Sequence, residues 1–115
     1  SGVDKVVKAA EIYQLPAPDF RVGELRTTAI LFAHQDFSSM TKADRIRACY
    51  QHCCLMYVSN QRMSNQSLRD RFGLSESKAA SVSQVIGAAK ESGSIKADES
   101  ETSSTRYARY LPFWA

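Results

Sequence analysis

Two helix-start signals and two helix-stop signals fall within residues 63–95, which read MSNQSLRDRFGLSESKAASVSQVIGAAKESGSI. Ser64 is a favourable N-cap for a short helix, and Gly73 is placed to end that helix in the left-handed conformation. Ser75 predicts the start of a second helix, whose apolar residues recur at helical spacing until Gly93 ends it. Two short helices joined by a tight turn are typical of a helix-turn-helix, which reads DNA in many regulators and elsewhere serves packing or dimerisation.

A longer helix is predicted before this unit, from Thr41 to about Asn60. Thr41, followed by Asp44 three residues later, resembles a capping box. Apolar residues recur along one stripe of the segment, which predicts that the stripe faces the core. The stripe consists of Ile46, Cys49, Tyr50, Cys53, Met56 and Tyr57.

Two strands are predicted after the helix-turn-helix, over Ile95 to Ala97 and over Thr105 to Leu111. Three helices followed by a β-hairpin predict a winged helix, with the polar segment Asp98 to Ser104 at the tip of the wing. The aromatic end, Pro112 to Trp114, is expected to pack on the core, because a free aromatic tail would expose apolar surface.

The first 33 residues predict one helix and one strand, which cannot close a domain by themselves. Val3 to Leu15 has the apolar spacing of an amphipathic helix. Arg21 to Ala33 is rich in β-branched and aromatic residues, which predicts a strand entered through a turn at Gly23. The predicted fold class is therefore α+β, a winged helix preceded by an αβ remnant. We interpret residues 1–33 as the end of a preceding domain, residues 34–40 as a linker and residues 41–115 as the winged-helix domain.

Composition and charge limit the setting and the partners. The content of 43% hydrophobic and 23% charged residues is that of a globular domain, and no apolar run approaches the roughly 18 residues of a membrane span. We expect a cytoplasmic protein with no membrane partner, because no secretory signal pattern is visible. The net charge of +3 lies downstream of residue 33, and this mild bias predicts weak affinity of the domain alone for DNA.

No spacing typical of a catalytic or metal site is present in the sequence. Cys49, Cys53 and Cys54 lie on one predicted helix, and their odd number argues against a disulfide framework. A zinc site built from Cys49 and Cys53 with His52 or His34 lacks the second ligand pair that structural zinc sites usually have. His52 is expected at the surface or an interface, because no acid or nucleophile accompanies it at a readable spacing. We predict no catalytic residue, metal or cofactor in this chain.

Two runs of the sequence carry a resemblance to a known family, RIRACYQHCCLMYVSNQRMSNQSLRDRFGL and the terminal TRYARYLPFWA. They resemble the C-terminal winged-helix domain of bacterial proteins described as RecG-related ATP-dependent DNA helicases or transcriptional regulators, which begin with a Schlafen/AlbA-type domain. Residues 1–33 resemble the end of the ATP-binding-like domain that precedes it in that family. The resemblance implies that upstream domains of the same chain are partners and that any use of ATP belongs to them, because no G-x-x-x-x-G-K-[ST] phosphate loop occurs here.

The predicted contacts to duplex DNA come from the two short helices and from the last strand. The amides at a helix N-terminus favour a phosphate, Gln84 is suited to adenine, and Lys78 with nearby serines is suited to phosphates. The predicted set is Ser64, Asn65, Gln66, Ser77, Lys78, Ser81, Gln84, Arg106 and Arg109.

The acidic wing tip supports an alternative without DNA contact. Asp98, Glu99 and Glu101 place negative charge where many winged helices approach the DNA backbone. The alternative is a protein-interaction module that dimerises with a second copy through the long helix and the aromatic tail. We rank an enzyme fragment last.

Overall fold

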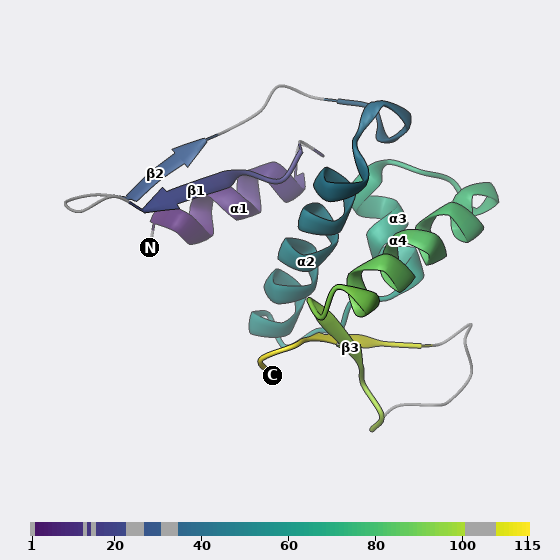
Figure 1. The fold of residues 1–115 in the computed structure, drawn as a ribbon. Helices are drawn as coiled ribbons and strands as arrows, with labels where there is room; N and C mark the ends of the chain where they lie inside the picture. The colour runs from purple at the N-terminus through teal and green to yellow at the C-terminus, as the bar shows by residue number, and fades with distance from the viewer. Residues whose placement is uncertain (1, 13, 15, 23–26, 31–34, 101–107) are drawn as a thin grey trace.

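The computed structural model describes residues 2–12, 14, 16–22, 27–30, 35–100 and 108–115. Within these residues the chain has an α+β fold of four α-helices and two antiparallel strand pairs, compatible with the predicted winged helix (Figure 1). The elements in order are α1 Gly2–Ile12, β1 Asp19–Val22, β2 Thr27–Ile30, the 3₁₀ turn η1 Phe37–Ser39, α2 Lys42–Val58, α3 Asn65–Phe72, the 3₁₀ turn η2 Glu76–Lys78, α4 Ala79–Glu91, β3 Ile95–Ala97 and β4 Tyr110–Pro112.

Helix α2 is the central element, with α1 on one side of it and α3 and α4 on the other (Figure 1). It begins as predicted after Thr41, whose hydroxyl accepts the Asp44 backbone N–H at 3.1 Å. The buried stripe is confirmed where it meets the core, because Cys49 and Cys53 are 0% exposed. Tyr50, by contrast, belongs to the half-buried edge of the helix.

The predicted first helix of the pair is confirmed at both ends. Ser64 accepts the Ser67 backbone N–H at 3.1 Å, and Ser67 Oγ accepts the Ser64 backbone N–H at 2.9 Å, which completes a capping box. Gly73 ends α3 with φ at +70°. The second helix differs from the prediction, because the 3₁₀ turn η2 follows Ser75 and regular α-helix begins only at Ala79.

The core lies where α2, α3, α4 and β3 meet. The largest side chains with no exposed surface there are Met63, Leu68 and Val82, which come from the approach to α3, from α3 and from α4. The apolar residues of α4 recur at helical spacing and face this core, so the opposite face of α4 remains available to a partner. Cys49, Cys53, Val85, Ile86, Ala89 and Ile95 complete the cluster.

The predicted strand over Ile95 to Ala97 is confirmed as β3, which pairs with β4 in antiparallel register. Strand β4 runs from Tyr110 to Pro112, whereas the prediction placed it over Thr105 to Leu111. Tyr110 also pairs with Met63, so β4 connects the strand pair to the entrance of α3. Residues 101–107, which include the start of the predicted strand, lie outside the described residues.

The N-terminal segment corrects two predictions. Helix α1 ends at Ile12 rather than Leu15, and Gln14 already has φ at +55°. The strand predicted after Gly23 is confirmed as Thr27–Ile30, but the prediction missed the strand Asp19–Val22, which pairs with it antiparallel. The β-forming residues lie on both sides of Gly23, and composition alone does not separate one interrupted strand from two.

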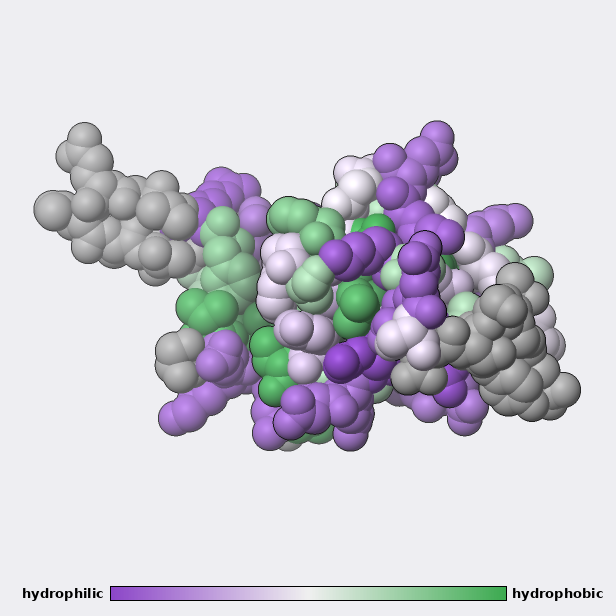
Figure 2. Space-filling view, turned by 90° about the horizontal axis from the view of Figure 1, so that it is seen from below, coloured by the Kyte–Doolittle hydropathy of each residue, from purple (hydrophilic) through white to green (hydrophobic). Residues whose placement is uncertain are grey.

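The aromatic tail lies on α2 and is buried only in part. Pro112 is fully buried, but Phe113 is 57% exposed and Trp114 48% exposed. The Phe113 ring stacks on Tyr50 at 6.1 Å between centroids, and Trp114 contacts Tyr57 edge-on at 5.3 Å. Hydrophobic side chains reach the surface of the molecule beside hydrophilic ones in the view from below (Figure 2). The expected packing on the core therefore holds for Pro112 alone.

No helix in the described ranges combines the length and the apolar character needed to cross a membrane.

Gly73 gives a direct test of the turn between α3 and η2. We expect Gly73→Ala to lower the free energy of unfolding by about 1–2 kcal/mol, because the left-handed φ of +70° disfavours a Cβ. That Cβ would also lie 2.9 Å from Gln14 Oε1. Urea denaturation measures the change. Gly87→Ala is the matched control inside α4, where open space surrounds the new methyl group and a gain of up to about 1 kcal/mol is expected. Equal effects at both sites would contradict the assigned turn.

Candidate nucleic-acid interface

One side of α4 lines an open groove of about 1190 Å³. Lys78, Ser81 and Gln84 of the predicted set come together on this side. The opposite wall belongs to η1 and the first turn of α2, where Lys42 and Arg45 lie. Sequence reasoning missed these two cations, because nothing in the spacing indicates that the start of α2 approaches α4.

The groove has an apolar floor and a rim of mixed charge. Phe37 and Phe72 contact each other in the floor, with ring centroids 4.9 Å apart. Arg45 lies over the Phe37 ring at 3.8 Å from its centroid and donates to the Phe37 carbonyl oxygen, which fixes the guanidinium at the rim. Asp36 and Glu91 also line the groove and oppose the cations. Lys78, the last residue of η2, is an exposed cation of this lining.

The predicted residues at the start of α3 mainly hold the helix pair together. Asn65 Nδ2 donates to the Ala79 carbonyl oxygen and to Ser83 Oγ, both at 2.9 Å, which joins α3 to α4. Asn65 Oδ1 accepts from Arg69 Nε at 2.7 Å. The Ser64 hydroxyl is engaged in the capping box, and Gln66 is exposed. Of these three side chains, Gln66 is the one best placed for an outside partner.

The remaining predicted residues are spread over the turn and the last strand. Ser77 is exposed, and its hydroxyl is 2.8 Å from that of Ser75. Arg109 is half-buried and donates to the Ala108 carbonyl oxygen at 3.1 Å. Arg106 lies outside the described residues. The groove therefore unites three of the nine predicted residues, and the others lie elsewhere or are not described.

The acidic wing tip is partly neutralised at its first residue. The Asp98 carboxylate accepts from the Ser100 hydroxyl at 2.6 Å and from Arg62 Nε at 3.3 Å. The Ser100 hydroxyl hydrogen bond, with Arg62 beside it, lowers the pKa of Asp98 below its ordinary value. Glu99 is exposed, and Glu101 lies outside the described residues. The repulsion that the sequence suggests at this tip is therefore weaker at Asp98.

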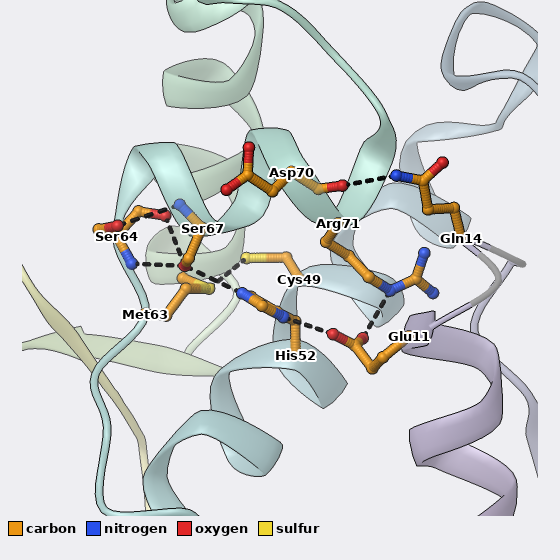
Figure 3. A network of polar contacts seen from close by, with 9 residues as sticks. All are labelled: Glu11, Gln14, Cys49, His52, Met63, Ser64, Ser67, Asp70 and Arg71. Atoms are coloured by element: carbon orange, nitrogen blue, oxygen red, sulfur yellow. Dashed lines mark hydrogen bonds and ion pairs between the residues drawn. The ribbon is translucent and has the colours of Figure 1, made fainter.

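His52 corrects the expectation of a surface histidine. It is 6% exposed, and it lies between Glu11 of α1 and Ser67 of α3 (Figure 3). The distance is 2.5 Å from His52 Nδ1 to Glu11 Oε2 and 2.9 Å from His52 Nε2 to Ser67 Oγ. An ionised carboxylate only accepts, so the proton of this contact lies on His52 Nδ1. Sequence spacing could not reveal this contact, because Glu11 is 41 residues from His52.

The order Ser67, His52, Glu11 matches the connectivity of a nucleophilic triad, but the surroundings indicate a structural role. Ser67 Oγ accepts the Ser64 backbone N–H at 2.9 Å and lies 3.1 Å from the Ser64 carbonyl oxygen, so the capping box occupies it. Neither Ser67 nor His52 lines the groove. The network therefore joins three helices.

Cys49 and Cys53 behave as apolar core residues, whereas Cys54 is half-buried. Burial raises the pKa of the Cys53 thiol to about 12, and burial likewise raises that of Cys49, with the neighbouring Cys53 adding to the effect. Thiols with raised pKa remain protonated near neutral pH, which makes them poor nucleophiles and poor metal ligands. Among the residues that the structure describes, no group of three or more side chains could hold a metal ion.

The fold and the groove define an α+β protein with a helix pair that presents a polar and cationic side. Comparison of this chain with protein-family models, with curated proteins and with solved structures gives no match.

Proposed function

We propose that residues 41–115 are a winged-helix domain that binds duplex DNA weakly and without catalysis. The observation that supports this most is the convergence of Lys78, Ser81 and Gln84 on one side of α4, with Lys42 across the groove. Lysine suits phosphates, and the Gln84 amide has a donor and an acceptor that complement the acceptor and donor of adenine in the major groove. The resemblance stated above agrees with a module at the C-terminus of a RecG-related helicase or regulator, in which upstream domains carry any ATP chemistry.

Binding to a fluorescent mixed-sequence duplex tests the proposal through its salt dependence. We expect dissociation constants in the micromolar range or weaker at 50 mM salt, because the basic excess is small. Three phosphate contacts would lower the affinity roughly 40-fold between 50 and 200 mM salt. Lys78→Gln and Lys42→Gln should each weaken binding several-fold and reduce the salt slope by about one. Fluorescence anisotropy measures both quantities.

The matched control is Lys5→Gln at an exposed position near the start of α1, which lies on the other side of α2 from α4 (Figure 1). Its affinity should stay within about twofold of the parent, because long-range charge effects are screened beyond roughly 10 Å at 0.1 M salt. Equal losses for all three lysines would indicate diffuse charge attraction and not a site on α4. The absence of binding at high micromolar duplex in low salt would overturn the proposal.

A second candidate function is association with a protein, for which the exposed side chains of α2 and the tail are the supporting observation. Val58, Phe113 and Trp114 are 67%, 57% and 48% exposed. Sedimentation velocity across a hundredfold range of concentration separates the two candidates. A mass that rises with concentration, together with no binding to duplex, favours self-association.

A further inference from the structure

Polar side chains hold helix α1 against helix α3 of the helix pair. Ala10 is the buried residue of α1, whereas Val3 is 46% and Ile12 66% exposed. Val6 and Val7 are half-buried, and Ala17 after the helix packs with Met40 and Ala48, so apolar burial supplies part of the docking of α1. The polar side-chain contacts that reach α3 come from Glu11 and from Gln14 just beyond the helix.

Glu11 bridges α2 and α3 with the two oxygens of one carboxylate. Oε2 lies 2.5 Å from His52 Nδ1 on α2, and Oε1 lies 2.5 Å from Arg71 Nε on α3. The side chains of Arg71, His52 and Glu11 are only 3%, 8% and 12% exposed. Charge-assisted hydrogen bonds are strongest in such surroundings, because water does not compete for them.

The same segment reaches both ends of α3 (Figure 3). At the N-terminal end the path runs from Glu11 through His52 to Ser67, whose hydroxyl belongs to the cap of the helix. At the C-terminal end Arg71 meets Glu11 directly, and Gln14 Nε2 donates to the Asp70 carbonyl oxygen at 2.9 Å. A movement of α1 therefore changes the contacts of the first and the last turn of α3 together.

We propose that Glu11 is a clamp through which the docking of α1 sets the position of α3 and so regulates the helix pair. The regulatory part rests on the proposed function, because it takes α3 and α4 as the DNA-contacting unit. If α1 moved away, His52 and Arg71 would lose the carboxylate that they share inside the molecule. Removing one partner of a buried ion pair is costly, so α3 would shift toward water and the two states would be discrete.

Hydrogen exchange of backbone amides tests the clamp without DNA. Glu11→Gln keeps the shape of the side chain and removes its charge. We expect the Ser67 and Leu68 amides of α3 to exchange at least tenfold faster, together with the amides of α1. The Val85 and Ile86 amides of α4 should change less than threefold, because the hydrogen bonds of the clamp end on α2 and α3. NMR or mass spectrometry provides the rates.

Lys8→Gln is the control, because it changes one charge on an exposed position of the same helix and should leave all these rates unchanged. Faster exchange in α1 without faster exchange in α3 would overturn the clamp. Unchanged exchange in both α1 and α3 would overturn it as well. If Glu11→Gln unfolds the whole chain, Glu11→Asp decides the question. Aspartate keeps the charge but is one methylene shorter, so its carboxylate lies further from His52 and Arg71. A uniform rise in exchange across α3 and α4 would refute the proposal that Glu11 controls α3 selectively.

The affinity of the same variants for duplex DNA tests separately whether the clamp regulates DNA binding. Glu11→Gln should weaken binding at least threefold, although Glu11 does not line the groove. A parent chain that fails to bind duplex refutes the proposed function and leaves the exchange result to judge the clamp. If the parent chain binds duplex and Glu11→Gln binds equally well despite faster exchange in α3, the regulation is refuted. The clamp and the proposed DNA binding both stand in that case.

Discussion

Replacing Leu68 by alanine is expected to lower the free energy of unfolding by about 3 kcal/mol, the central value for a fully buried leucine. Leu68 is 0% exposed and packs in the core of α2, α3 and α4. Domains of this size have a total stability of about 5–15 kcal/mol, so the variant would lose a large fraction of it. Thermal denaturation followed by circular dichroism should show a midpoint lower by about 15 °C.

Val58→Ala provides the comparison for this loss. Val58 lies at the end of α2 and is 67% exposed, so its truncation should change the free energy of unfolding by no more than about 0.5 kcal/mol. Similar losses for Leu68→Ala and Val58→Ala would show that α3 does not pack as described. The helix pair would then lack the support that holds α4 in place.

Raising the pH above about 9 is expected to destabilise the protein steeply. Burial raises the pKa of Cys53 to about 12 and raises that of Cys49, whereas both thiols titrate near 8.5 once unfolded. Between these values the unfolded chain binds fewer protons than the folded chain, so stability falls as pH rises. With two thiols the slope approaches about 2.7 kcal/mol per pH unit. Urea denaturation at pH 7, 9 and 10 measures it.

The double variant Cys49→Ala/Cys53→Ala isolates this effect. It begins with lower stability, because it leaves cavities, but its stability should fall much less steeply between pH 8.5 and 10. The slope that remains comes from Cys54, whose pKa burial also raises. Burial also raises the pKa of Tyr50 and of Tyr110, so both proteins should lose stability above about pH 10. A parent protein whose stability stays constant from pH 8.5 to 10 would contradict the buried state of the two thiols.

The parts of the fold that follow from local chemistry could be predicted from the sequence. Thr41, Ser64 and Gly73 act on neighbouring backbone groups, and all three appear at the helix ends where their chemistry places them. The start of α4 was misplaced, because the turn after Ser75 is 3₁₀ and residue preferences do not separate it from the first turn of an α-helix.

The contacts between distant segments could not be predicted. Glu11 meets Arg71 across 60 residues, and no pattern in either helix indicates the other. The groove depends on the approach of Lys42 to the side of α4, which is a result of how α2 and α4 cross. The hydrogen bonds of Asn65 to Ala79 and Ser83 are of the same kind, because a short polar side chain at a helix start can serve a neighbouring helix or a phosphate.

The aromatic tail has an optical consequence. Trp114 is the single tryptophan of the chain, and its indole N–H donates to the Tyr50 hydroxyl at 3.0 Å while its ring contacts Tyr57. Its fluorescence therefore originates at one known place, where the last residues lie on α2. Two tyrosines within contact distance make it an efficient acceptor of excitation energy. The protein thus contains its own reporter for the seating of the C-terminal residues, and no dye has to be attached.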